Sequence, residues 1–513
     1  MEKDLDQLEE LVIGTNRMSG QGLREQAWQA AHGLIALGVE PEDRVAILMR
    51  NDLAQLQATL AAQRLGAYPV QINWHGTGDE IAYVLGDCRP RVLIAHADLL
   101  ARIPASALSG IITIAAAPSA EVRQAYGLAP ADGAIPGLDW HGWLDAQPVH
   151  PPPARAATDS IIYTSGTTGH PKGVKRFVPT DEQRARTERM RFLITGIDGE
   201  ARVMVPAPLY HTAPNLIALR ALRQARSLVL PTRFDPEAFL ADVERHGITH
   251  VYAVPTMFSR LLKLPEPVRN RYDLSSLRFV LHAGGPCAPG IKTAMLQWWG
   301  PVIHEYYGST EAGPNTFCRG EEWLARPGTV GRAIEGVRIE VRDAAGAPLP
   351  DGEIGELHVF NDNYPDFTYL NRPDERQALQ RGELLASGDV GYRDRDGYYF
   401  LCDRKRDLVI SGGVNIYPAE IESVLLDFHG VADCAVFGIP DEEFGERVAA
   451  FVEPHAGQAL DLADLRAFLA GRLATFKIPR LIEIRDHLPR DEAGKIRKRY
   501  LREPYWENAQ RKI

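Results

Sequence analysis

Along the first part of the chain, segments whose apolar residues recur at helical spacing are followed by short apolar runs typical of strands. Apolar positions recur at helical spacing over 23–37, and the apolar run at 43–49 then predicts a strand. The same order follows twice more, with helices expected at 53–66 and 80–85 and strands at 67–72 and 91–95. A helix at 234–246 and a strand at 249–254 continue it. Strands that alternate with helices predict a parallel sheet covered by helices.

The pattern changes near residue 404. A strand is expected at 397–402, and beyond it shorter elements follow: strands at 408–410 and 431–437, and helices at 419–426 and 462–473. These elements predict a compact α+β unit of about 110 residues, a typical size for a small domain. We therefore expect an α/β protein with a large N-terminal domain of helix-covered sheets over 1–404 and a small α+β domain over 405–513.

Composition narrows the classes of protein that fit this pattern. The 513 residues exceed one ordinary core, and the net charge of −10 argues against a nucleic-acid binder. No apolar run approaches the length that spans a bilayer, and the acidic N-terminus does not resemble a secretion signal. The five cysteines lie far apart, which fits a reducing cytoplasm. The oligomeric state is left open, with a homodimer as one option.

A segment rich in glycine and hydroxyl residues follows an expected buried strand at 160–163. It runs Tyr163-Thr-Ser-Gly-Thr-Thr-Gly-His-Pro-Lys-Gly173. Glycines let backbone N–H groups approach anionic oxygens, hydroxyls donate hydrogen bonds, and the lysine adds a mobile positive charge. A Walker P-loop does not fit, because Pro171 stands where its second glycine belongs. We predict a different polyphosphate loop, rather than an ordinary flexible one, formed by Thr164, Ser165, Gly166, Thr167, Thr168, Gly169 and Lys172.

Further motifs accompany this loop in a fixed order along nearly the whole chain. They are Pro208-Leu-Tyr-His211, Ala283-Gly-Gly-Pro286, Tyr306-Tyr-Gly-Ser-Thr-Glu311, Ser387-Gly-Asp-Val-Gly391, Asp403-Arg404 with Ser411-Gly-Gly413, and Asp491-Glu-Ala-Gly-Lys495. Together with the loop, this set resembles the adenylate-forming enzymes, which include acyl-CoA synthetases, adenylation domains of peptide synthetases and firefly-type luciferases.

The resemblance implies that the small α+β domain is mobile and rotates between adenylation, which needs Lys495, and transfer to a thiol. It also implies a role for each motif. The catalytic set it implies is Lys495 at the acyl carboxylate, Thr310 at the α-phosphate of ATP, Glu311 as the ligand of Mg²⁺, and His211 either as a gate of the acyl pocket or as the residue that orients the substrate carboxylate. The other implied contacts are Gly285, Pro286, Tyr307 and Gly308 for adenine, Asp389 and Arg404 for ribose, Gly412 and Gly413 for a pantetheine arm, His211, Asn215, Gly284 and Gly285 for the acyl pocket, and Arg406 for the hinge.

The residue types suit these roles, although each has a structural alternative. One carboxylate with phosphate oxygens and waters suits Mg²⁺, and an ionised aspartate can accept both ribose hydroxyls. Tyr307 could instead be a core tyrosine, Asp389 a turn residue, Arg404 a surface salt bridge and His211 a helix cap. Arg406 departs from the family, which more often has Asp or Lys there. The basic residues that follow Lys495, at 497–499, are expected to form a solvated tail.

These features favour an ATP-dependent acyl-CoA synthetase. It would activate a small-molecule carboxylic acid as an acyl-adenylate and transfer the acyl group to CoA, with ATP, Mg²⁺ and CoA as cofactors. The alternatives are an enzyme that loads a carrier protein's phosphopantetheine arm, a luciferase-like oxygenase, and a non-catalytic nucleotide- or acyl-binding protein. The stretch 212–215 has no Asp for an α-amine, which disfavours an amino-acid substrate. Medium-chain, aromatic and alicyclic acids remain as candidates.

Overall fold

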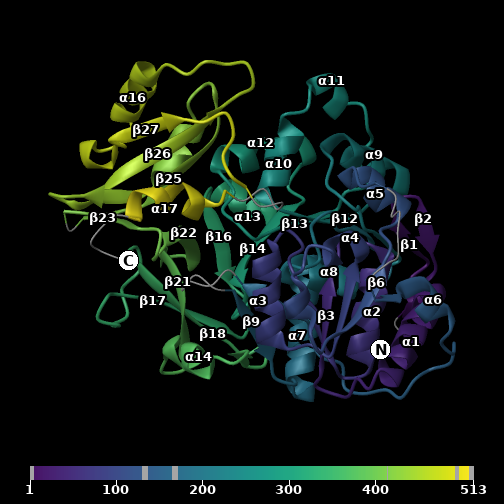
Figure 1. The fold of residues 1–513 in the computed structure, drawn as a ribbon. Coiled ribbons are helices and arrows are strands. Elements are labelled where there is room, and N and C mark those ends of the chain that lie inside the picture. Colours follow the sequence, from purple (N-terminus) through teal and green to yellow (C-terminus); the bar gives the residue numbers. More distant parts are fainter. Residues whose placement is uncertain (1–4, 130–136, 165–170, 413, 491–495, 508–513) are drawn as a thin grey trace.

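The structure is a computed structural model that describes residues 5–129, 137–164, 171–412, 414–490 and 496–507. Strands within these ranges form three sheets, of 14, 8 and 5 strands. In Figure 1 the two larger sheets and their helices fill the purple-to-green body, and the third sheet lies in the yellow-green part at the upper left. The expected class, a large N-terminal α/β part with a small C-terminal α+β part, is confirmed. No helix in the described ranges is long and apolar enough to cross a membrane.

The sheet of eight strands confirms the parallel, helix-covered arrangement expected for the first part of the chain. Its order is β19-β9-β8-β4-β3-β5-β6-β7, and all neighbours from β8 to β7 are parallel. The strands are β3 (Arg44–Leu48), β4 (Tyr68–Gln71), β5 (Val92–His96), β6 (Ile112–Ala116), β7 (Leu138–Asp139), β8 (Ile161–Thr164), β9 (Lys172–Arg176) and β19 (Phe367–Tyr369). The accompanying helices are α1 (Gly20–Ala36), α2 (Leu53–Arg64), α3 (Gly78–Cys88), α4 (Ala97–Leu100), α5 (Ala120–Tyr126) and α6 (Trp140–Asp145).

Capping residues define where these helices begin. The Ser19 hydroxyl accepts the Gly22 N–H at 3.1 Å at the start of α1. At the start of α3, the Glu80 carboxylate accepts the Thr77 N–H at 2.7 Å while the Thr77 hydroxyl accepts the Glu80 N–H at 3.3 Å, a reciprocal capping box. Such caps satisfy N–H groups that have no partner inside the helix.

The sheet of 14 strands has a parallel half and an antiparallel half. Its order is β17-β18-β21-β22-β16-β15-β14-β13-β12-β10-β11-β1-β2, with β20 beside β21, and the strands from β14 to β1 are parallel. The parallel half contains β1 (Glu10–Ile13), β10 (Arg202–Met204), β11 (Ser227–Val229), β12 (His250–Ala253), β13 (Phe279–His282) and β14 (Ile303–Ser309). The remaining strands are β2 (Asn16–Met18), β15 (Gly313–Cys318), β16 (Thr329–Ala333), β17 (Val337–Arg342), β18 (Gly355–Asn361), β20 (Gln380–Arg381), β21 (Leu384–Arg393) and β22 (Tyr398–Arg404).

Helices connect the parallel strands of this second sheet. They are α8 (Thr212–Gln224), α9 (Pro236–His246), α10 (Pro255–Leu262), α11 (Glu266–Arg269) and α12 (Pro289–Trp299). Of the other helices, α7 (Asp181–Thr195) lies between β9 and β10, α13 (Gly320–Ala325) between β15 and β16, and α14 (Pro373–Ala378) between β19 and β20. Because each parallel strand is entered from the same side, all carboxyl ends lie at one edge of the sheet and all amino ends at the other. The two edges carry the two sites described below.

The third sheet has its own apolar core, built from residue 409 onward. Its order is β24-β23-β26-β25, with β27 beside β26. The elements are β23 (Val409–Ser411), β24 (Val414–Ile416), α15 (Pro418–Leu426), β25 (Val431–Asp441), β26 (Gly445–Pro454), α16 (Leu462–Ala470), β27 (Leu481–Ile484) and α17 (Lys498–Trp506). The strands β24, β26 and β27 and the helix α17 were not expected from the sequence.

Lys498 corrects the expectation of a solvated basic tail. It begins α17, and its Nζ lies 2.7 Å from Glu422 Oε1 on α15. Burial would lower the pKa of this amine, but Glu422 and Asp403 outweigh it and raise the pKa. The lysine therefore stays charged where α17 joins the small sheet, whereas the neighbouring Arg499 side chain remains 65% exposed.

Candidate active site

Several of the predicted site residues that the structure describes lie where parallel strands of the two large sheets end. Thr164 is the last residue of β8, and Thr310 directly follows β14. His211 follows β10 through a short connection, and Gly284 lies just beyond β13. Carboxyl ends of parallel strands are the usual location of ligand sites in open α/β sheets. The 3.4 Å hydrogen bond from the Thr164 hydroxyl to Glu311 Oε1 joins the two sheets at this point.

Glu311 is the centre of an oxygen-rich cluster. Its Oε1 accepts a hydrogen bond from the Tyr369 hydroxyl at 2.9 Å as well as the one from Thr164. Burial, together with the charge of Glu311, raises the pKa of Tyr369, so the phenol remains a donor. Hard oxygen ligands are the set that Mg²⁺ prefers. The described chain holds no group of three or more His, Cys, Asp or Glu side chains that could bind a metal, so Mg²⁺ here would rely on Glu311 with substrate oxygens and water.

Thr310 is positioned through both its side chain and its main chain. Its hydroxyl lies 2.6 Å from the hydroxyl of Thr212, the first residue of α8. Arg176 on β9 donates to the Thr310 carbonyl at 2.6 Å and to the Glu311 carbonyl at 3.0 Å. The guanidinium also lies 4.6 Å from the ring centroid of Tyr364. The turn that presents Thr310 and Glu311 is therefore tied to the neighbouring sheet.

Asp389 and Arg404 form a second cluster with Tyr307. Asp389 and Arg404 are directly paired in the β21–β22 register, and Arg404 Nε lies 3.6 Å from Asp389 Oδ1. The Tyr307 hydroxyl donates to Asp389 Oδ2 at 2.7 Å, and the Ser387 hydroxyl accepts the Asp389 N–H at 3.1 Å. Burial, followed by the nearby Asp389 charge, raises the pKa of Tyr307. The expected ribose-binding pair is thus brought together with the expected adenine-binding tyrosine.

The glycines of the predicted set differ in what surrounds them. The β14–β15 register shifts between Tyr307 and Gly308, and a Cβ at Gly308 would lie 2.3 Å from the Gly313 carbonyl oxygen. Gly308 is therefore required for the close approach of these strands. Gly284 adopts a φ of +86°, which favours glycine, whereas a Cβ at Gly285 would meet no atom within 4 Å, and Pro286 follows it.

Lys172 is not the mobile charge that the sequence suggested. Its side chain is 9% exposed, and its Nζ pairs with Glu375 on α14. The amine also lies 5.2 Å from the ring centroid of Tyr369. The physical reason is that β19 pairs with the free edge of β9, which brings Tyr369 and then α14 next to this lysine. A role at a phosphate would require Lys172 to leave Glu375.

His211 and Asn215 lie at the start of α8. His211 is the residue that precedes the helix, and its ring lies 4.3 Å from that of Tyr210. Asn215 is buried, and its amide donates to the Leu209 carbonyl at 3.1 Å. The asparagine therefore supports the turn that carries His211.

The remaining predicted residues concern the loop, the hinge and the catalytic lysine. Ser165, Gly166, Thr167, Thr168, Gly169, Gly413 and Lys495 lie outside the described residues. Gly412 has a φ of +57°, and its N–H donates to the Phe444 carbonyl at 2.8 Å. Arg406 lies in a turn closed by the hydrogen bond from Asp407 N–H to the Arg404 carbonyl at 2.9 Å, and burial, followed by the Arg404 charge, lowers the pKa of Arg406.

Sequence reasoning missed four residues of these clusters. Lys172, Val174 and Arg176 alternate along β9 and so share a face, a signal that could have pointed to Arg176. The other three are Thr212, Tyr369 and Glu375. Tyr369 and Glu375 belong to segments that carried no motif, and Thr212 directly follows the motif that ends at His211, whose composition does not show which residue its hydroxyl meets.

The fold and these clusters define an adenylate-forming enzyme, and comparison with known proteins gives the same result. Residues 6–363 match the model of the AMP-binding enzyme family, and residues 420–495 match that of the AMP-binding enzyme C-terminal domain. The chain therefore belongs to the AMP-binding enzyme family.

Relatives and solved structures share nearly the full length of the chain. A feruloyl-CoA synthase from an Amycolatopsis species is 34% identical over 485 residues, which cover 93% of this chain and 91% of that protein. An anthranilate CoA ligase solved with anthranoyl-AMP is 26% identical, with a TM-score of 0.85 over 96% of this chain and 93% of that chain. An amide bond synthetase from Marinactinospora thermotolerans is 28% identical, with a TM-score of 0.83 and coverage of 98% of both chains.

Proposed function

We propose that this protein is an ATP-dependent, AMP-forming acid–CoA ligase. The observation that carries the proposal is the pair of clusters, one of Glu311 with its hydroxyl neighbours and one of Asp389 with Tyr307 and Arg404. The first set suits Mg²⁺ and phosphate oxygens, and the second suits the hydroxyls of a ribose. The relatives named as CoA ligases support CoA as the acceptor.

In the proposed reaction, a carboxylate oxygen of the substrate attacks the α-phosphorus of ATP, and pyrophosphate leaves. The product is the acyl-adenylate, a mixed anhydride of the acid and AMP. The thiol sulfur of CoA then attacks the acyl carbon, and AMP leaves with the bonding electrons. Thr310, held by Thr212 and Arg176, is assigned to the α-phosphate, and Lys495 to the acyl carboxylate during the first step. Mg²⁺ held by Glu311 would neutralise charge on the phosphates.

The two steps need different surfaces of the small domain. We propose that residues 405–513 rotate about Arg406 between them, so that Lys495 serves adenylation and the segment around Gly412 and Gly413 admits the pantetheine arm. The tight turn at 404–407, which links β22 to the third sheet, supports a hinge at this position. The protein would work in the cytoplasm, where ATP and CoA are supplied.

Aromatic carboxylic acids are the substrates we propose to test first. The names of the feruloyl-CoA synthase and the anthranilate CoA ligase support this class. The amide bond synthetase favours a second candidate, in which an amine rather than CoA takes the acyl group. A carrier-protein thiol is the remaining acceptor.

The decisive experiment measures pyrophosphate release from ATP across a panel of aromatic, alicyclic and medium-chain acids. Each acid is assayed alone, with CoA, and with a simple amine. Acid-dependent release that turns over rapidly only with CoA supports the ligase and names its substrate class. Stimulation by the amine and not by CoA would replace it with an amide synthetase. If CoA and the amine both leave release unchanged, a carrier protein becomes the acceptor to test.

The variant K495A separates the two half-reactions. We expect it to abolish acid-dependent pyrophosphate release while it still converts a supplied acyl-adenylate and CoA to acyl-CoA. Equal loss of both half-reactions would contradict the assignment of Lys495 to adenylation alone.

A further inference from the structure

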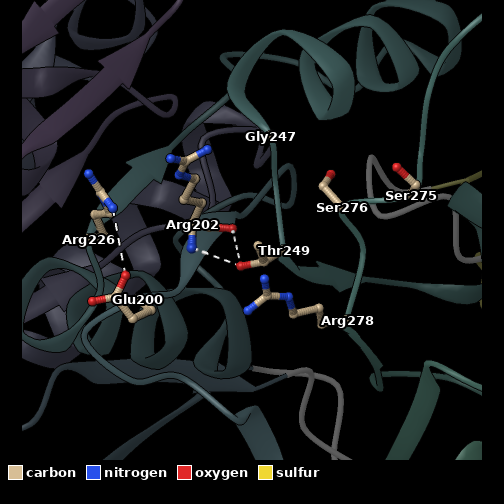
Figure 2. Close-up of a pocket in the computed structure, with 8 residues that line it drawn as sticks. All are labelled: Glu200, Arg202, Arg226, Gly247, Thr249, Ser275, Ser276 and Arg278. Atoms are coloured by element: carbon tan, nitrogen blue, oxygen red, sulfur yellow. Dashed lines mark hydrogen bonds and ion pairs between the residues drawn. The ribbon is translucent and has the colours of Figure 1, made fainter.

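A cavity of about 330 Å³ lies at the amino edge of the second sheet, opposite the edge that carries the candidate active site. Arg202 is the first residue of β10, and Arg226 and Arg278 directly precede β11 and β13. Thr249 directly precedes β12, which lies between β13 and β10 in the sheet. Because β13, β12, β10 and β11 are parallel neighbours, their amino ends place three arginines from distant parts of the sequence around one hollow (Figure 2).

Hydrogen bonds from main-chain N–H groups hold this edge of the sheet in place. The Thr249 hydroxyl accepts the Arg202 N–H at 2.9 Å, and the Thr249 N–H donates to the Arg202 carbonyl at 2.9 Å. The Arg278 N–H donates to the Thr249 carbonyl at 2.9 Å, and the Arg226 N–H donates to the Ala201 carbonyl at 2.9 Å. The backbones of the three arginines are thus fixed relative to one another, and only their side chains need to adjust to a ligand.

The positive charge in the cavity is only partly neutralised. Three arginines line it together with a single carboxylate, Glu200. Arg226 lies 2.8 Å from Glu9 and 3.6 Å from Glu200, whose side chains are 61% and 78% exposed. Arg202 and Arg278 pair with no carboxylate in the described part of the chain. In a protein with a net charge of −10, such an excess of positive charge within one hollow is unexpected.

The end of a helix explains the position of one of these arginines but not of the other two. Helix α9 ends at His246, and a Cβ at the following Gly247 would lie 2.7 Å from Arg202 Nη1. Arg202 therefore lies over the negative end of the helix dipole, in space that the glycine leaves open. Arg278 and Arg226 come from other strands, so the dipole of α9 gives no reason for their convergence on the same hollow.

We propose that this cavity, the arginine pocket, binds a phosphate-bearing dianion. Guanidinium groups donate paired N–H bonds that match the geometry of phosphate oxygens. A phosphate presents enough oxygens to engage Arg202, Arg278 and Arg226 together, whereas a monocarboxylate with two oxygens cannot satisfy all three. The flanking hydroxyl of Ser275, which is exposed, offers a further donor at the rim. The pocket is separate from the candidate active site and does not depend on the proposed function.

Hydrogen exchange of the full chain with inorganic phosphate tests the proposal, because it reports where the ligand binds. Phosphate is expected to protect the segments 198–204, 247–253 and 275–280, and chloride at the same ionic strength is expected not to. The double variant R202Q/R278Q should raise the phosphate concentration needed for half-maximal protection at least about tenfold. R278Q alone should cause a smaller increase in that concentration. Because Arg278 is exposed, the single variant is expected to fold, so it keeps the test valid if the double variant does not.

Two comparisons make the result specific. R395Q removes an exposed arginine from the turn between β21 and β22 and should leave protection of the three segments unchanged. Glycerol 3-phosphate replaces inorganic phosphate in a second series, and stronger protection by one or the other identifies a phosphate ester or free phosphate as the ligand. Protection confined to residues 307–311, or protection of the three segments that survives R202Q/R278Q, would overturn the proposal.

Discussion

The carboxylate of Asp389 contacts both Tyr307, at 2.7 Å, and Arg404, at 3.6 Å. If it binds the ribose of ATP, D389N removes the charge and one strong acceptor without changing the size of the side chain. Hydrogen bonds to charged groups contribute about 1.5–3 kcal/mol. We therefore expect kcat/KM for ATP, measured as acid-dependent pyrophosphate release, to fall roughly ten- to hundredfold.

Two further variants separate ligand binding from general damage to the sheet. Y307F removes only the hydroxyl that donates to Asp389 and should cause a smaller loss than D389N. D351N changes a carboxylate that pairs with Arg393 on the surface of the same sheet, and its activity should match that of the unmodified protein. A D389N enzyme with unchanged kinetics for ATP would exclude Asp389 from the nucleotide site.

His304 makes the stability of the protein depend on pH. Burial, followed by the charges of Arg319 and Lys292, lowers the pKa of His304 to about 4, and its Nδ1 accepts the Gly320 N–H at 3.1 Å. The unfolded chain, with a histidine pKa of about 6.5, therefore binds more protons than the folded chain between these two values. Stability from this residue is complete at neutral pH and is lost as the pH falls, by about 2 kcal/mol at about pH 5.

Chemical denaturation of the unmodified protein and of H304N at about pH 7 and about pH 5 measures this loss of stability. The asparagine can still accept the Gly320 N–H but does not titrate, so its loss of stability between pH 7 and pH 5 should be smaller by about 2 kcal/mol. The same decrease in both proteins would show that other groups cause the acid sensitivity.

At the scale of elements, local periodicity predicted the helices and strands that lie next to each other along the chain. The helix at 53–66 and the strand at 67–72 correspond to α2 and β4, and the strand at 249–254 corresponds to β12. What periodicity could not supply is pairing across long distances in sequence. The β9–β19 pair joins residue 174 to residue 369, and it alone explains why Lys172 meets Glu375 and Tyr369.

The same limit applies to the candidate site and to the arginine pocket. Motifs identified Asp389, Arg404 and Tyr307, because each stands in a short run with a recognisable composition. Thr212 and Arg176 both contact Thr310, which lies 98 and 134 positions further along the chain, and nothing in their own segments indicates this partner. In the sequence, Arg202 begins a strand and Arg226 and Arg278 directly precede one, and no motif marks any of these positions. Only the order of the strands in the sheet brings the three arginines together.

The bulge between β14 and β15 leaves no space for a side chain at Gly308, and a substitution can test this directly. A methyl group at Gly308 would lie 2.3 Å from the Gly313 carbonyl oxygen, so G308A must push β15 away or twist β14. We expect a loss of about 1–3 kcal/mol in the free energy of unfolding, together with loss of pyrophosphate release, because Thr310 and Glu311 follow this strand.

The matched control for that variant is G285A. It adds the same methyl group to a neighbouring glycine of the predicted site, where no atom lies within 4 Å. Without ligands its free energy of unfolding should stay within about 0.5 kcal/mol of the unmodified protein. Equal destabilisation by both changes would mean that a general cost of replacing glycine, rather than the contact with Gly313, is responsible.

Over the whole molecule, the turn at 404–407 is the covalent link between the second sheet and the small third sheet. A noncovalent contact reinforces it, since Asp403 on β22 accepts the Ala419 N–H of α15 at 2.8 Å. A second contact, between Lys498 and Glu422, lies within the small unit. If the small domain rotates about Arg406 as proposed, the rotation keeps the second contact and breaks the first. Both half-reactions would then depend on the dihedral angles of one residue.

Proline at that residue tests the rotation. R406P fixes φ near −65° and so holds the turn within a narrow range of conformations, whereas R406K keeps the charge and the freedom of the turn. We expect R406P to retain one half-reaction and to slow the other at least about tenfold, because only one orientation of the small domain remains accessible. Acid-dependent pyrophosphate release measures the first half-reaction, and conversion of a supplied acyl-adenylate to acyl-CoA measures the second. R406K should retain both, and equal rates in R406P and R406K for both half-reactions would rule out a hinge at this position.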